Sequence, residues 1–129
     1  MTTRIAALIL ACAALPVMAS EAENAFTKEV LECAAYYDIS SQVISSMDAP
    51  QMAAVADRLQ SSADKAVLIA NDYMAPEDVS KGVEAHKEQH MQKMAGASLG
   101  VLMKQYKDTC KSLVDNPQQR LDYWTMATM

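Results

Sequence analysis

Apolar side chains recur along most of this chain in alternating steps of three and four residues, the spacing of one face of an α-helix. The first such run extends from Phe26 to Met47 and the second from Met52 to Tyr73. A more polar run covers Val79 to Met94, and a fourth covers Leu99 to Leu113. The pattern predicts four amphipathic helices.

Prolines mark the starts of the second and third helices. Pro50 follows Asp48-Ala49, and Pro76 follows Ala75. Proline is well tolerated in the first turn of a helix, where its missing N–H needs no partner. The acidic residues at 77 and 78 favour a helix start there as well, since negative charge is stabilised at the N-terminal end of the helix dipole.

The first nineteen residues have the pattern of an export signal. Arg4 supplies the positive charge, an apolar run extends from Ile5 to Leu15, and Ala19 ends a small-residue cleavage site. The apolar run is too short to span a membrane, which takes about 20 residues. We expect residues 1–19 to be a signal peptide and residues 20–129 to form a single helical domain in the periplasm.

Lipid attachment at Cys12 is the alternative to cleavage after Ala19. Ile9-Leu10-Ala11-Cys12 loosely resembles a lipoprotein processing site, but Leu10 is unusual at its place and the preceding apolar run is short. Soluble export is therefore favoured. After removal of residues 1–19, no integral membrane segment is expected.

Cleavage leaves two cysteines, Cys33 and Cys110, both on the apolar faces of their helices. An even number of cysteines in an oxidising compartment favours a disulfide over two buried free thiols. The sequence has no strong helix-breaking signal between the third and fourth helices. One straight helix over residues 77–115 is therefore the alternative. Cys33 lies near one end of the first helix. A straight helix over residues 77–115 would place Cys110 roughly 50 Å from that end.

A disulfide requires Cα atoms within about 7 Å, so the chain must reverse near residues 95–100. The sequence therefore predicts an all-α fold: an up-down-up-down four-helix bundle with a short C-terminal helix and one disulfide linking the first and fourth helices.

The charge balance excludes some classes of partner. The formal net charge is −5, and it becomes −6 when Arg4 is removed with the signal peptide. Nucleic acids and anionic membrane surfaces attract cationic proteins, so neither is expected as a partner. The chain has only three glycines but ten methionines, a composition that favours helices. Methionine fills gaps in cores and also lines adaptable binding surfaces.

His86 and His90 are candidate metal ligands. Histidines four residues apart lie on the same face of a helix, and Met94 adds a thioether one turn further on. Imidazole with thioether suits copper, and imidazole alone suits zinc. The zinc-protease motif is absent, because no glutamate follows His86 directly. Further ligands would have to come from other helices. The alternative is that both histidines lie along a partly wet seam of the most polar helix.

The C-terminal segment is a candidate partner surface. Asn116 can cap a short final helix, on which Leu121 and Trp124 would cover the open end of the bundle. An exposed Tyr123-Trp124 pair beside Arg120 would instead be typical of an interaction hot spot. The covering role is the favoured interpretation.

No pattern of catalytic residues is found. The sequence has no G-x-S-x-G element, no phosphate-binding loop and no haem attachment motif. Both cysteines of residues 20–129 are assigned to a bond, which removes the obvious nucleophile. We expect the protein not to be an enzyme and to need no cofactor, with copper or zinc as the possibility left open by the histidines.

Three short runs resemble those of small, uncharacterised exported proteins in Gram-negative bacteria. They are Glu32–Tyr37, Tyr106–Cys110 and Arg120–Trp124, near the two ends of the expected mature chain. The resemblance implies a periplasmic setting and a linked first and fourth helix, and it implies no activity.

The leading functional hypothesis is a periplasmic binding or interaction module that captures another periplasmic or envelope protein, including an inhibitor or immunity role. A copper- or zinc-binding protein is the first alternative, and a purely structural role is the second.

Overall fold

A computed structural model describes residues 20–129, in which all regular secondary structure is helical. The expected signal peptide and Cys12 lie outside the described residues. The elements are α1 (Glu21–Ser45), the 3₁₀-helix η1 (Pro50–Met52), α2 (Ala53–Asn71), α3 (Pro76–Met94), α4 (Leu99–Asp115) and α5 (Pro117–Ala127). The all-α prediction is confirmed.

Helix starts follow the expected local signals. Ser20 caps α1, and its Oγ accepts a hydrogen bond from the Glu23 N–H at 3.1 Å. Pro76 occupies the first turn of α3. Between α3 and α4 the chain turns at Gly96, whose φ of 78° suits glycine because it has no Cβ. The expected break near residues 95–100 is therefore present, and a continuous helix over residues 77–115 is not formed.

Two apolar runs extend slightly past the helices that they predicted. Met47 lies beyond the end of α1 and is 51% exposed, so it does not join the core. Tyr73 lies beyond the end of α2, and its ring packs edge-on against buried Phe26 with the centroids 5.4 Å apart. Periodicity alone did not separate these residues from the helices before them.

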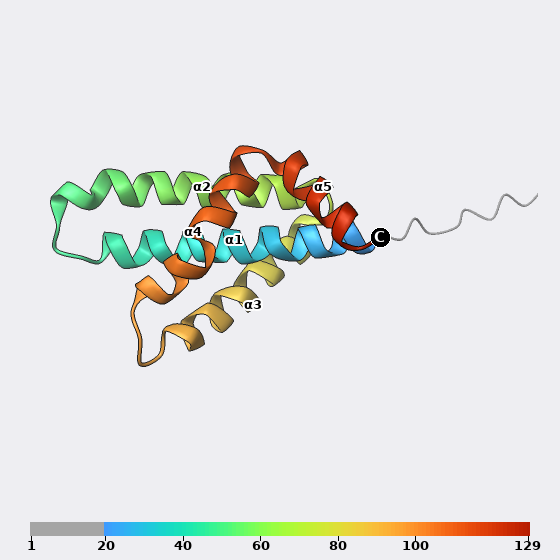
Figure 1. The fold of residues 1–129 in the computed structure, drawn as a ribbon. Helices are drawn as coiled ribbons and strands as arrows, with labels where there is room; N and C mark the ends of the chain where they lie inside the picture. Colours follow the sequence, from blue (N-terminus) through green and yellow to red (C-terminus); the bar gives the residue numbers. More distant parts are fainter. Residues whose placement is uncertain (1–19) are drawn as a thin grey trace, which may run out of the picture.

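α1 is the central element of the fold. It contacts α2, α3, α4 and α5, and Figure 1 shows α2 lying alongside it. The core around α1 includes the fully buried side chains of Phe26, Val30, Leu102 and Leu113. α3 approaches α1 closely at Gly82, where a Cβ atom would lie 2.6 Å from Leu31 Cδ1.

The disulfide joins α1 to α4 as expected. Cys33 and Cys110 are bonded, their Cα atoms are 5.4 Å apart, and both residues are fully buried. The structure does not confirm the finer expectation of an up-down-up-down four-helix bundle, because α4 crosses α1 obliquely in Figure 1. Helices pack at steep as well as shallow angles, and an apolar stripe does not choose between them.

Candidate functional site

The two histidines occupy neighbouring turns of α3 and have different surroundings. His90 is 1% exposed, and its ring packs against Tyr106 with the centroids 4.8 Å apart. Its Nε2 lies 2.9 Å from the carbonyl oxygen of Glu32 on α1. A carbonyl oxygen can only accept, so Nε2 carries the hydrogen and donates it. His86 is only half-buried.

Burial is the main influence on the protonation of His90. Desolvation lowers its pKa, because the charged imidazolium loses water, and nearby Lys93 and His86 lower it further. The hydrogen bond to Glu32 acts in the opposite direction but is the smaller effect. His90 is therefore a neutral core histidine whose ring connects α3 to α1.

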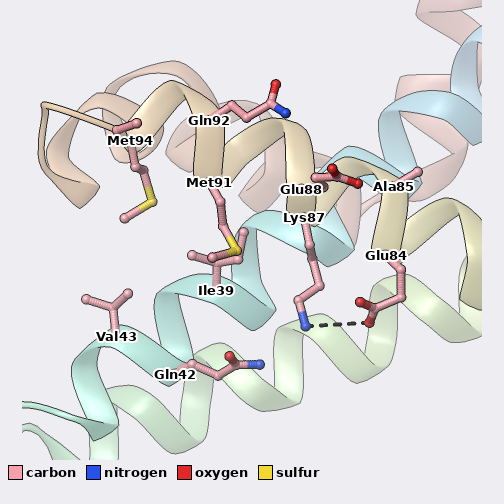
Figure 2. Close-up of a pocket in the computed structure, with 11 residues that line it drawn as sticks. Ile39, Gln42, Val43, Glu84, Ala85, Lys87, Glu88, Met91, Gln92 and Met94 are labelled. Atoms are coloured by element: carbon pink, nitrogen blue, oxygen red, sulfur yellow. Dashed lines mark ion pairs between the residues drawn. The ribbon is translucent and has the colours of Figure 1, made fainter.

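The arrangement meets part of the requirement for a metal site. The His86 and His90 ring centroids are 6.4 Å apart, and both Nδ1 atoms are buried without a hydrogen-bond partner. Met94 lines a groove, with its side chain directed toward Val43 (Figure 2). Within residues 20–129, no group of three His, Cys, Asp or Glu side chains is placed to hold a metal ion.

Arg120 and Trp124 of the candidate partner surface contribute to packing within the chain. The Arg120 guanidinium forms a two-point ion pair with Glu29 on α1, with Nη2 2.8 Å from Oε2. It also lies over the Tyr123 ring, 4.1 Å from the centroid. Trp124 and Leu121 are partly buried against the core, the contact that the covering interpretation requires. Tyr123 is 50% exposed.

A groove lies between α1 and α3. It has a volume of about 890 Å³. Ile39, Val43 and Met94 supply apolar walls, and Met91 projects from α3 toward Ile39 (Figure 2). Met91 is 61% exposed, whereas the apolar side chains of Val43 and Met94 are half-buried. The groove therefore presents flexible apolar surface to solvent.

The rim of this groove is acidic. Lys87 is its one cation, and its Nζ lies 2.7 Å from Asp38 Oδ2 and 3.6 Å from Glu84 Oε1. The hydrogen bond to Asp38 is the main reason why the pKa of Lys87 is raised. Asp38 and Glu84 together outweigh the single positive charge of Lys87, and the exposed Glu88 adds a further carboxylate, so the net charge at the rim is negative.

Sequence reasoning missed this groove. Its only signal was Met91, an apolar residue in the polar stretch of α3, next to residues assigned to the candidate metal site. The ion pairs of Lys87 with Asp38 and of Arg120 with Glu29 were also missed. Each joins residues far apart in the chain, and neither spacing nor composition identifies such a pair.

Comparisons of this chain with protein-family models, with curated proteins and with solved structures found no match. Within residues 20–129, every helix is too short or too polar to cross a membrane.

Proposed function

We propose that this protein is a periplasmic interaction module that captures a partner protein through the α1–α3 groove. The observation that carries the proposal is Met91, a large apolar side chain 61% exposed beside an apolar groove of about 890 Å³. Methionine adapts its shape to different apolar partners, and for that reason it is common on helix-binding surfaces. An inhibitor or immunity role would use the groove in the same way.

The chemistry of the groove favours an amphipathic helix with basic flanks as the bound segment. Its apolar side chains would pack on Ile39, Val43 and Met91, and its lysines or arginines would lie near Glu84 and Glu88. The excess of acidic residues over the whole chain would favour the same kind of partner during encounter. A second copy of this chain fits less well, because two acidic rims repel each other.

The test is affinity capture from a periplasmic extract with two matched baits. Met91→Lys places a charge in the groove, and Met126→Lys makes the same change on α5, where the methionine is 74% exposed. The wild-type and Met126→Lys baits should retain the same protein, and the Met91→Lys bait should lose it. The retained protein should then bind less tightly at higher salt, since the rim contacts are ionic.

Two results would contradict the proposal. Equal retention by the Met91→Lys and Met126→Lys baits would exclude the groove as the binding surface. Loss of capture by Tyr123→Ala alone would place the partner on α5 instead, because Tyr123 is the exposed aromatic residue there.

A copper- or zinc-binding role is the second candidate. It is favoured by the unpartnered Nδ1 atoms of His86 and His90, and by the hydrogen bond that leaves the lone pair of His90 on Nδ1. A backbone carbonyl that accepts from the other ring nitrogen is a common way to orient a metal-binding histidine. The missing part is a third ligand.

A further inference from the structure

A second pocket lies between α1, α2 and α4, on residues that the α1–α3 groove does not use. Its volume is about 480 Å³, within the usual range for sites that hold small molecules. α4 crosses α1 and does not run along it (Figure 1), so the helices diverge on either side of the crossing. The pocket is lined by residues of all three helices and is more enclosed than the groove.

Much of the pocket lining is apolar, and Ser40 and Ser62 add hydroxyl groups to it. Ile44, Leu59, Leu99 and Val114 line it from the three helices, and each of them is buried or half-buried. Met103 also lines the pocket and is 38% exposed. These side chains suit a flexible hydrocarbon chain more closely than a polar ligand.

Three cations line this pocket in a chain that is acidic overall: Arg58, Lys107 and Lys111. Lys111 is bound to Asp115, the only acid that lines the pocket, with Nζ 2.6 Å from Oδ2. Within residues 20–129, neither Arg58 nor Lys107 has a carboxylate at ion-pair distance. Asp108 lies close enough to act on Tyr36 but does not line the pocket. Arg58 and Lys107 therefore give the pocket lining two positive charges that no ion pair among the described residues neutralises.

The two tyrosines of the pocket add no negative charge. Burial raises the pKa of Tyr37 to about 12, with smaller contributions from Tyr36 and Asp115. Burial also raises the pKa of Tyr36. Both hydroxyls therefore stay protonated at neutral pH, and neither one repels an anion.

We infer that the pocket between α1, α2 and α4 binds a medium-chain fatty acid, with its alkyl chain inside and its carboxylate at Arg58 and Lys107. An apolar lining suits the alkyl chain of such a molecule, and cations without an ion-pair partner in the described part of the chain suit its carboxylate. Arginine is well suited to a carboxylate, because its planar guanidinium can donate two parallel hydrogen bonds. A chain of about ten carbons is compatible with a pocket of this size.

Binding of three ten-carbon probes tests this inference on the exported, disulfide-bonded protein. Decanoate, decanol and decyltrimethylammonium share the alkyl chain and differ in charge. Calorimetry measures the binding of each, with the two ionic probes kept below their micelle concentrations and decanol below its solubility limit. Decanoate should bind at least tenfold more tightly than decanol, and decyltrimethylammonium should bind most weakly. Shortening the acid should weaken binding about three- to fourfold per methylene, the free-energy gain of burying a CH₂ group.

Matched variants locate the site. Arg58→Gln combined with Lys107→Gln should weaken decanoate binding at least tenfold and leave decanol unchanged. Lys104 is an exposed lysine of α4 that does not line the pocket, so Lys104→Gln should leave decanoate binding unchanged. Met91→Lys, in the α1–α3 groove, should also leave it unchanged. All four residues are exposed, so the melting temperature should show that each variant folds.

Three outcomes would overturn the inference. They are the absence of decanoate binding at about 1 mM, equal affinity for decanoate and decanol, and an equal effect of the double substitution and Lys104→Gln. Because the pocket and the groove share no residue, failure here leaves the proposed interaction role untouched.

Discussion

The guanidinium of Arg120 and the carboxylate of Glu29 form a two-point ion pair across 91 residues of chain. The pair joins α5 to α1, and both side chains are mostly covered, with 25% and 12% exposed. Because Trp124 lies one turn after Arg120 on the same helix, the pair also keeps the indole against the core.

Loss of this ion pair should destabilise the docking of α5. Arg120→Met leaves a mostly covered carboxylate without its partner, and we expect it to lower the free energy of unfolding by about 1–2 kcal/mol. Trp124 fluorescence should shift to longer wavelength as the indole meets water. Urea denaturation followed by fluorescence measures both effects.

A double-mutant cycle with Glu29→Gln separates the ion pair from the packing of the arginine stem. Lys111→Met is the matched control, because its pair with Asp115 is exposed on α4 and should contribute too little to measure. Additive effects of Arg120→Met and Glu29→Gln would show that the pair does not stabilise the fold.

Reduction of the disulfide should lower the melting temperature by more than about 10 °C. The bond between Cys33 and Cys110 closes a loop with a sequence separation of 77, which stabilises the fold by about 4 kcal/mol in the chain-entropy model. Calorimetry of the oxidised and reduced wild-type protein measures the change without creating a cavity. Cys33→Ala combined with Cys110→Ala should then be insensitive to reductant, and a shift of that variant on reduction would contradict the assignment.

Stability should fall as the pH is lowered below about 6.5, the ordinary pKa of histidine. The pKa of His90 is lowered in the folded state, so the unfolded chain binds the proton first and acid favours unfolding. The loss should continue until the pH reaches the depressed pKa of the folded state. Urea denaturation at a series of pH values measures this slope.

Two substitutions assign this slope to one histidine. His90→Gln retains an N–H at the position of Nε2 for the Glu32 carbonyl but does not titrate, so the slope around pH 6 should decrease. His86→Gln, one turn earlier on α3, is the matched control. A slope that persists unchanged in His90→Gln would show that His90 is not its cause.

No stoichiometric adduct with copper or zinc is expected in native mass spectrometry. His86 and His90 are two ligands on one helix, and within residues 20–129 no third His, Cys, Asp or Glu joins them. A one-to-one adduct that is absent from His86→Ala would favour the metal-binding role. Its binding should then weaken below about pH 6.5, since only neutral imidazole binds a metal.

The exported protein should begin at Ser20, the residue that caps α1. Cleavage after Ala19 leaves the serine side chain in place to accept from Glu23 N–H. Intact-mass analysis of protein from the periplasmic fraction checks this expectation. A lipid-modified mass that starts at Cys12 would replace it with an anchored protein.

The sequence by itself determined where the helices lie and which cysteines bond. The three- and four-residue spacing of apolar side chains, with Pro50 and Pro76 at the breaks, located the helices to within a few residues. Local backbone preferences and the period of the helix carry this information. Cys33 and Cys110 were predictable because residues 20–129 contain no other cysteine.

Only the tertiary structure decided how α4 crosses α1 and what lies in the spaces beside the crossing. An apolar stripe indicates which face of a helix is buried, but the angle depends on how the side chains of two helices interlock. The same limit applies to single residues: His90 donates to Glu32, and Arg120 pairs with Glu29, because packing brings distant positions together. Both candidate binding surfaces, the α1–α3 groove and the pocket beside α4, result from that packing.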